Sequence, residues 1–309
     1  MEKNDRKKKT APFLILLAGC LWGSMGIFVR TLNAWGMESF EIVALRSYVT
    51  MVCMLVLLVV FQRKLLKIRL RDIWCFLGTG LCSIVFFNYC YFRTIMETSM
   101  PVAAVLLYTA PVMVVLMSAV LFREKITPAK MAALVMVVIG CALVAGLVGN
   151  GHTLTPAGLL VGLGAGFGYA LYSIFSRYAL ERGYHPLTIL FYTFTFASVG
   201  VLPFADMGAV WDAVTADAAH AGISLVFGLV STVVPYFVYT MGLSSVENGT
   251  ASILASVEPV TASILGIVLF GDRVDAWQAA GMLLVFASII ICNLAPKETK
   301  GRACRERQA

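Results

Sequence analysis

Two stretches of this chain follow the same pattern at a constant separation of 148 residues. Residues 111–126 begin Pro-Val and end Val-Leu-Phe-Arg-Glu-Lys-Ile, and residues 259–274 begin Pro-Val and end Val-Leu-Phe-Gly-Asp-Arg-Val. At a nearly equal separation of 147 residues, Trp22-Gly23 with Arg30 matches Tyr169-Ala170 with Arg177. The repeat predicts two structurally equivalent halves, and this constrains the fold more than any other feature of the sequence.

The composition indicates that both halves lie in a membrane. Of the 309 residues, 60% are hydrophobic and 13% are charged, whereas about a quarter are charged in soluble domains. At ~20 residues for each transmembrane helix, the chain has room for about ten spans and for no sizeable soluble domain.

Ten apolar segments can be placed, and most of the connections between them are short. They run over residues 12–33, 40–61, 73–92, 99–121, 128–147, 156–178, 187–205, 220–241, 249–270 and 276–295. The predicted fold is therefore an all-α integral membrane protein with ten transmembrane helices. Its predicted parts are a basic N-terminus at 1–11, a first five-helix repeat at 12–147, a second at 156–295 and a basic tail at 296–309.

The basic residues predict the orientation of these spans. With the N-terminus in the cytoplasm, 20 of the 24 Lys and Arg residues fall in cytoplasmic segments, as the positive-inside rule requires. Both termini are then cytoplasmic, and the expected location is the plasma or inner membrane. Membrane topology explains the net charge of +7 better than nucleic-acid binding does. Five spans separate the two copies of the pattern, so the halves should be inverted, an arrangement typical of proteins whose central site opens to either side.

These features together resemble the EamA-type drug/metabolite transporters, over about residues 12–295. The resemblance rests on two five-span repeats, Trp22-Gly23, Arg46 in an Ala-Leu-Arg stretch, and the paired Pro-Val…Leu-Phe-x-acid-base segments. The chain departs from the family's pattern at Gly271-Asp272, where the family's acid is usually Glu. The resemblance implies secondary transport of a small metabolite, often an amino acid or a relative, and commonly export.

Glu258 is the one acid placed deep in a predicted span, directly before Pro259. A charged acid at the centre of an isolated span costs roughly 2.5–3.5 kcal/mol on insertion scales. Two interpretations stay open. Glu258 could bind a substrate amine or couple transport to protons from a central cavity, or it could be a neutral, hydrogen-bonded residue that packs its helix. No Lys or Arg is predicted at its depth, so the sequence predicts no ion pair.

Arg46 lies about six residues into the second span, roughly 9 Å along the helix. It could bind a substrate carboxylate, but the favoured interpretation is structural, either capping carbonyls or pairing with an acid such as Glu41. Arg30 and Arg177 lie near helix ends, where long side chains reach the interface. The two copies differ at the functional candidates, because Ala110 stands where the second copy has Glu258, and Thr193 stands where the first has Arg46.

Polar or amphipathic residues near mid-depth are further candidates to line a central substrate cavity. They are Trp22, Asn88, Tyr91, Tyr108, Tyr169, Tyr172, Ser231, Tyr236 and Tyr239. Each could equally be a packing residue, since aromatic walls with few polar groups suit both roles. Pro111 and Pro259 interrupt helical hydrogen bonding and are the predicted gating or hinge positions. The alternating glycines at 162–168 predict a close helix–helix contact.

Nothing in the sequence indicates an enzyme, a cofactor or a metal. The three histidines, His152, His185 and His220, fall in or beside predicted loops, and no nucleophile or phosphate-binding motif is present. The expected partners are a small-molecule substrate, the lipid bilayer and, through Glu258, protons. A lipid-carrier flippase and a membrane-embedded enzyme are the alternative functions, and the sequence leaves open whether the protein is a homodimer.

Overall fold

The computed structural model describes residues 2–147 and 155–294, and every regular element in these ranges is helical. The predicted basic tail at 296–309 lies outside the described residues. In the basic N-terminus at 1–11, side chains are described from Thr10 onward.

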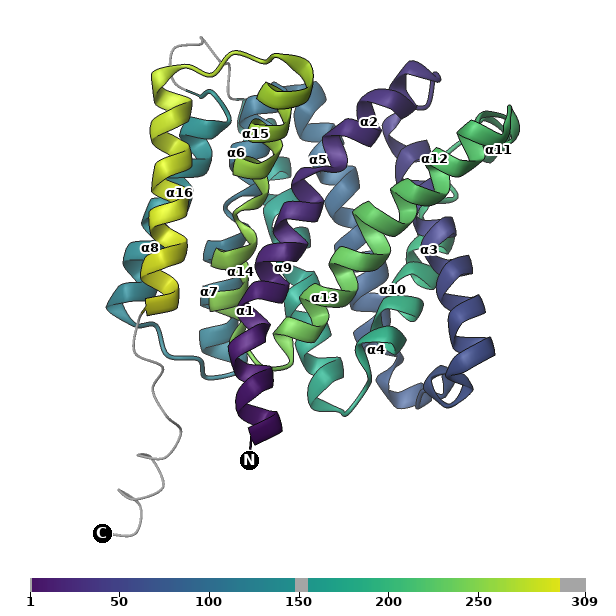
Figure 1. Cartoon of the computed structure of the whole chain (residues 1–309), viewed down its shortest axis with the longest axis horizontal. Helices are drawn as coiled ribbons and strands as arrows, with labels where there is room; N and C mark the ends of the chain where they lie inside the picture. Colours follow the sequence, from purple (N-terminus) through teal and green to yellow (C-terminus); the bar gives the residue numbers. More distant parts are fainter. Residues whose placement is uncertain (1, 148–154, 295–309) are drawn as a thin grey trace.

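Each predicted apolar segment coincides with one helix or with a run of consecutive helices (Figure 1). The first half contains α1 (Glu2–Gly23), α2 (Met25–Ala34), α3 (Ser39–Phe61), η1 (Arg63–Leu66), η2 (Leu70–Asp72), α4 (Ile73–Leu77), η3 (Gly78–Val85), α5 (Phe86–Glu97), α6 (Met100–Leu107), α7 (Ala110–Leu121) and α8 (Pro128–Val144). The second contains α9 (Pro156–Glu181), α10 (Pro186–Val201), α11 (Met207–Thr215), α12 (Ala218–Gly228), η4 (Leu229–Val233), α13 (Val234–Leu243), α14 (Asn248–Ala255), α15 (Glu258–Phe270) and α16 (Ala276–Leu294).

Within residues 2–147 and 155–294, seven helical stretches are long and apolar enough to cross a membrane, and three shorter apolar helices accompany them. The shorter ones are Pro128–Val144, Pro186–Val201 and Ala276–Cys292. The segment at 206–219, predicted as a plain connection, contains α11. Asp206 and Asp217 cap α11 and α12 by accepting hydrogen bonds from backbone N–H groups. His220 therefore lies in the first turn of α12 and not in a loop.

Helix boundaries recur at the spacing of the sequence repeat. The helices α5 and α13, α6 and α14, α7 and α15, and α8 and α16 all begin 148 residues apart, while α3 and α10 begin 147 apart. The wide π-helical turns η3 and η4 precede α5 and α13 in the same way. The repeated sequence thus produces repeated local structure, including its irregular parts.

The two proline segments break their helices at equivalent places. The chain leaves helical geometry at residues 108–109 between α6 and α7, and at 256–257 between α14 and α15. Pro111 and Pro259 follow each break as the second residue of the next helix, where a missing N–H group costs no helical hydrogen bond. The segments 99–121 and 249–270, each predicted as a single span, therefore each consist of two half-helices.

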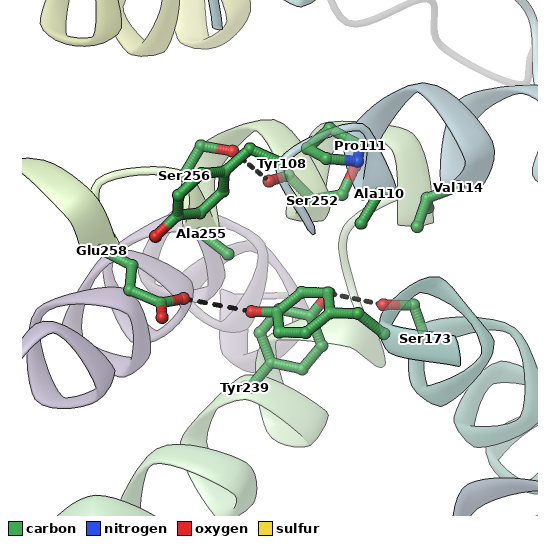
Figure 2. Close-up of a pocket in the computed structure, with 11 residues that line it drawn as sticks. Tyr108, Ala110, Pro111, Val114, Ser173, Tyr239, Ser252, Ala255, Ser256 and Glu258 are labelled. Atoms are coloured by element: carbon green, nitrogen blue, oxygen red, sulfur yellow. Dashed lines mark hydrogen bonds between the residues drawn. The ribbon is translucent and has the colours of Figure 1, made fainter. Parts of the chain in front are cut away.

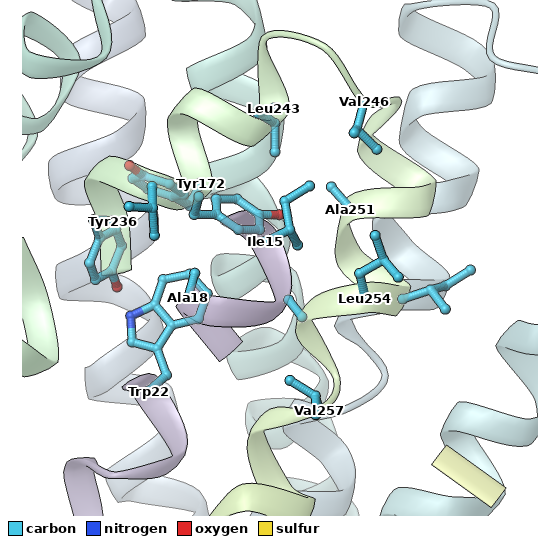
Figure 3. Packing of buried hydrophobic residues seen from close by; sticks show 14 of the residues in the cluster. Ile15, Ala18, Trp22, Tyr172, Tyr236, Leu243, Val246, Ala251, Leu254 and Val257 are labelled. Carbon is cyan, nitrogen blue, oxygen red and sulfur yellow. The ribbon is translucent and has the colours of Figure 1, made fainter. Parts of the chain in front are cut away.

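Glycines let other helices approach these breaks closely. A Cβ atom on Gly19 of α1 would lie 2.8 Å from the carbonyl oxygen of Ala255, and one on Gly166 of α9 would lie 2.9 Å from that of Leu106. The predicted close contact of the 162–168 glycines is confirmed, since Gly162 also abuts Leu106. Figure 3 shows α1 side chains, Ile15, Ala18 and Trp22, packed against α13 and α14.

The repeat also predicts the effect of a substitution at a strained backbone position. Arg123 has φ 55°, and its repeat mate Gly271 has φ 69° after α15. A left-handed conformation costs a residue with a Cβ roughly 1–2 kcal/mol. Glycine avoids this cost but loses more chain entropy on folding, which offsets about 0.5–1 kcal/mol of the gain. We expect Arg123→Gly to stabilise the protein by roughly 0.5–1 kcal/mol and Gly271→Ala to destabilise it by about 1 kcal/mol. Thermal unfolding in detergent measures both, and a stabilising Gly271→Ala would contradict this account.

Candidate functional site

A small cavity lies beside both helix breaks, between α7, α9, α13, α14 and α15 (Figure 2). Its lining consists of Tyr108, Ala110, Pro111, Val114, Tyr169, Ser173, Tyr239, Ser252, Ala255, Ser256 and Glu258. The space that the centre of a water molecule can reach is about 20 Å³, which is enough for one water. In this conformation the cavity has no room for a metabolite.

Glu258 supplies the one carboxyl group in this lining. It is the first residue of α15, directly after the break, and not a mid-helix residue as a single span would make it. The hydroxyl of Tyr169 donates a hydrogen bond to its Oε2 over 3.2 Å. The helix N-terminus favours a negative charge at this point. Gly23 allows α1 to touch the same residue, because a Cβ there would lie 2.6 Å from the Glu258 carbonyl oxygen.

Arg46 of α3 is buried, with 4% of its surface exposed. Its guanidinium donates to Asn88 Oδ1 over 3.4 Å and to Met25 Sδ over 3.7 Å, and its Nε has no hydrogen-bond partner. The predicted pairing with Glu41 is wrong, since Glu41 Oε2 instead accepts from the backbone N–H of Glu38.

Hydrogen-bonded aromatic residues form the layer next to the cavity. Tyr239 and Ser173 hydroxyls lie 2.7 Å apart, and those of Tyr172 and Thr240 lie 2.8 Å apart. The ring of Trp22 contacts those of Tyr236 and Tyr239 at 5.1 and 5.3 Å between centroids. The indole N–H of Trp22 is buried and has no partner among the described residues. The layer therefore holds a fixed shape while leaving one donor unused.

The predicted site residues thus divide into three groups. Tyr108, Tyr169, Tyr239, Glu258 and Pro111 line the cavity. Trp22, Tyr172 and Tyr236 form the aromatic layer against Tyr239, and Arg46 and Asn88 are buried and hydrogen-bonded to each other outside the lining. The cavity lining does not include Tyr91, Ser231 or Pro259. Tyr91 packs in a tilted contact against Phe87, which contacts Tyr169, and Ser231 is buried in η4 with no hydrogen-bond partner in the described part of the chain.

Three serines of the lining were not predicted. Ser173 follows Tyr169 by four residues on α9, and Ser256 follows Ser252 by four residues at the end of α14. The four-residue spacing places each pair on one helix face. The spacing of Ser173 from Tyr169 was the available signal for Ser173, whereas Ser252 and Ser256 are six and two residues before Glu258 and had no such signal. Within residues 2–147 and 155–294, no cluster of three or more His, Cys, Asp or Glu could hold a metal ion.

Comparison with known proteins places this architecture. The model of the EamA-like transporter family matches twice, over residues 9–146 and 156–294. The chain belongs to the EamA-like transporter family. With its apolar helices, this makes it a multi-pass membrane protein.

Relatives of this family member carry transporter names. The uncharacterized transporter YxxF of Bacillus subtilis (strain 168) is 27% identical, covering 98% of this chain and 95% of its own. An uncharacterized transporter of Archaeoglobus fulgidus is 28% identical, covering 90% and 94%. A probable amino-acid metabolite efflux pump of Salmonella typhimurium is 22% identical, covering 90% and 93%. A crystal structure of another protein aligns with a TM-score of 0.77 over 97% of this chain and 99% of that one, at 17% identity, which shows the shared fold.

Proposed function

We propose that this EamA-family protein is a secondary transporter that exports an amino acid or a related small metabolite across the cytoplasmic membrane. The observation that carries the proposal is a carboxyl group, Glu258, in the lining of a cavity beside the helix breaks, in a bundle that also buries the guanidinium of Arg46. The Nε donor of Arg46 has no hydrogen-bond partner among the described residues. A solute with both an amine and a carboxylate would complement these two groups. The Salmonella typhimurium relative's name, a probable amino-acid metabolite efflux pump, supports the same class.

The proposed mechanism is alternating access by two inverted halves. In this proposal all ten apolar segments cross the membrane, residues 12–147 and 156–295 form the two five-helix repeats, and both termini are cytoplasmic. The recurrence of helix boundaries at 147–148 residues supports the repeat, and the distribution of basic residues supports the orientation. The breaks before Pro111 and Pro259 divide their spans at mid-depth, where the half-helices could move separately.

Glu258 is also the proposed site of proton coupling. A half-buried carboxyl group that accepts a hydrogen bond from Tyr169 can take up a proton and release it as the cavity changes sides. The proton and the substrate amine would then compete for one carboxyl group, and this competition would couple movement of the proton to movement of the substrate.

A metabolite-toxicity screen tests the proposed function. Cells that overproduce the protein, cells that lack it and cells that produce Glu258→Ala are grown on inhibitory amounts of single amino acids and their analogues. We expect overproduction to raise resistance to one amino-acid class, and Glu258→Ala to abolish that resistance. Equal growth of all three strains on every amino acid and related metabolite would contradict the proposed function.

A further inference from the structure

We propose that Glu124 and Arg177 are positioning residues that clamp the turn at 243–249. The end of the bundle where this turn lies is called the Glu124 face. The clamp stabilises the conformation in which the cavity is closed at the Glu124 face, relative to the conformation closed at the opposite face. The inference rests on the proposed function, because it concerns which side of an alternating-access protein is closed at rest. It comes from a difference between the two repeats in what otherwise equivalent charged residues bind.

The clamp consists of charged side chains bound to backbone groups. Glu124 accepts hydrogen bonds from the N–H groups of Asn248 (2.7 Å) and Gly249 (3.1 Å), the first two residues of α14. Arg177 donates to the carbonyl oxygens of Leu243 (2.7 Å) and Val246 (3.3 Å), at and just beyond the end of α13. A carboxylate at a helix N-terminus and a guanidinium at a helix C-terminus both complement the helix dipole.

An ion pair strengthens the same contact between the two halves. Lys130, at the start of α8, pairs with Glu247, which precedes α14. Lys130 also donates to the carbonyl oxygen of Lys125 over 3.1 Å, so its ammonium group is held in place. Glu124 and Lys130 belong to the first half, and both bind the turn of the second.

The clamp lies directly below the cavity. Ser173, Tyr239 and Ser252 line the cavity, and the clamp engages the same three helices four residues away from them, at Arg177, Leu243 and Asn248. Four residues of helix span ~6 Å. Asn248 also donates from Nδ2 to the carbonyl oxygen of Ser173 over 3.3 Å. Opening the cavity toward this face therefore requires the clamp to release the turn.

The repeat mates of Glu124 and Arg177 are Asp272 and Arg30, and they bind each other. The backbone is equivalent at both acids, since Glu124 N–H donates to Ser118 O and Asp272 N–H donates to Gly266 O, each over 3.2 Å. The side chains differ in their partners, because Asp272 Oδ2 lies 3.1 Å from Arg30 Nη2. This pair is 47% and 54% exposed, and exposed ion pairs contribute little to stability.

The opposite face cannot build an equal clamp from its own residues. The mates of Asn248 and Gly249 are Met100 and Pro101, and proline has no N–H group to donate. Asp272 is also one methylene shorter than Glu124. The mates of Lys130 and Glu247 are Gln278 and Ser99, neither of which carries a charge. Closure of the opposite face thus forms fewer charge-assisted hydrogen bonds, and the resting equilibrium favours the state closed at Glu124.

The symmetry also predicts the partners in the other state. When the cavity opens toward the Glu124 face, Glu124 should pair with Arg177 as Asp272 now pairs with Arg30. Asp272 should then reach the N–H group of Met100, the one donor remaining at the start of α6. Transport thus exchanges a backbone clamp for an ion pair on each face in turn.

Thiol labelling from one side tests this bias without knowledge of the substrate. In a variant without the eight native cysteines, Ser252→Cys places a thiol in the cavity. The reagent is a charged, membrane-impermeant methanethiosulfonate applied to vesicles of known orientation. Lys64→Cys, in the exposed η1 turn before α4, is the reference thiol that shows whether the reagent reaches the Glu124 face. We expect slow labelling of Ser252→Cys from this face, and roughly tenfold faster labelling when Glu124→Ala is added, since a charge-assisted hydrogen bond is lost.

Two further variants separate the clamp from general damage to the fold. Gly249→Pro copies Pro101, removes one clamp donor and keeps a residue that fits the first helical turn, so it should also speed labelling. Asp272→Ala, the matched change on the opposite face, should not speed labelling from the Glu124 face. Thermal unfolding checks that each variant is folded. Equal labelling rates in the parent, Glu124→Ala and Gly249→Pro would overturn the clamp. If the protein transports metabolite but the variants leave the labelling rate unchanged, the clamp is overturned and the proposed function stands. If the variants change the labelling rate but the protein transports no metabolite, the proposed function is overturned instead.

Discussion

Glu258→Gln is expected to abolish proton-driven accumulation of substrate while leaving exchange of substrate measurable. The amide keeps the shape of the carboxyl group and can still accept the hydrogen bond from Tyr169, but it cannot take up a proton. If one proton moves per substrate, a gradient of one pH unit supports about tenfold accumulation, because one unit corresponds to ~1.4 kcal/mol. The variant should show about onefold accumulation in proteoliposomes under the same gradient.

An exposed acid provides the control for this result. Asp212 lies on α11 away from the cavity lining, so Asp212→Asn should retain the full gradient-driven accumulation. Undiminished accumulation in Glu258→Gln would contradict the coupling role. It would leave Glu258 as a substrate-binding or packing residue, which the exchange rate would distinguish.

Arg46→Ala is expected to raise the KM for substrate by about 10–100-fold, with a smaller change in the maximal rate. A hydrogen bond to a charged group contributes roughly 1.5–3 kcal/mol, and the buried Arg46 guanidinium has an Nε donor without a partner among the described residues. Arg46→Lys keeps the charge but loses the planar fork that matches a carboxylate, so its KM should lie between those of the wild type and Arg46→Ala. Initial uptake rates over a range of substrate concentrations measure both variants.

A structural role for Arg46 predicts a different pattern. If Arg46 only holds Asn88 and Met25 in place, Arg46→Ala should lower the melting temperature and the amount of folded protein, while the KM of the folded fraction stays within about twofold of wild type. Such a result would remove the carboxylate-binding role from the proposed function.

The helices were largely predictable because their signals are local. Apolar length, short polar connections and the repeat at 147–148 residues placed all ten apolar segments, and their helical structure is confirmed. The helix breaks were less predictable. The prolines marked where hydrogen bonding fails, but the sequence did not show that the helices end there, at places where Gly19 and Gly166 let neighbouring helices approach closely.

The candidate site was predicted in part, for a similar reason. Glu258 and its neighbouring tyrosines were identifiable as polar groups at mid-depth in apolar segments. The burial of Arg46 against Asn88 and Met25 was not identifiable, because it depends on how α3 packs within the bundle and not on the position of Arg46 along its own helix. The clamp at Glu124 was visible only as a repeated acid, since its partners are backbone groups of a distant turn.

Measuring counterflow before and after the cavity is blocked tests most directly whether solute passes between the two halves at Glu258. Proteoliposomes containing the Ser252→Cys protein are loaded with the metabolite found in the growth screen, and uptake of the labelled metabolite is followed before and after reaction with a bulky thiol reagent. The cavity leaves about 20 Å³ beside this residue, so a reagent attached there should fill the path. The account predicts transient accumulation before labelling and loss of counterflow after it. Undiminished counterflow through fully labelled, folded protein would contradict it.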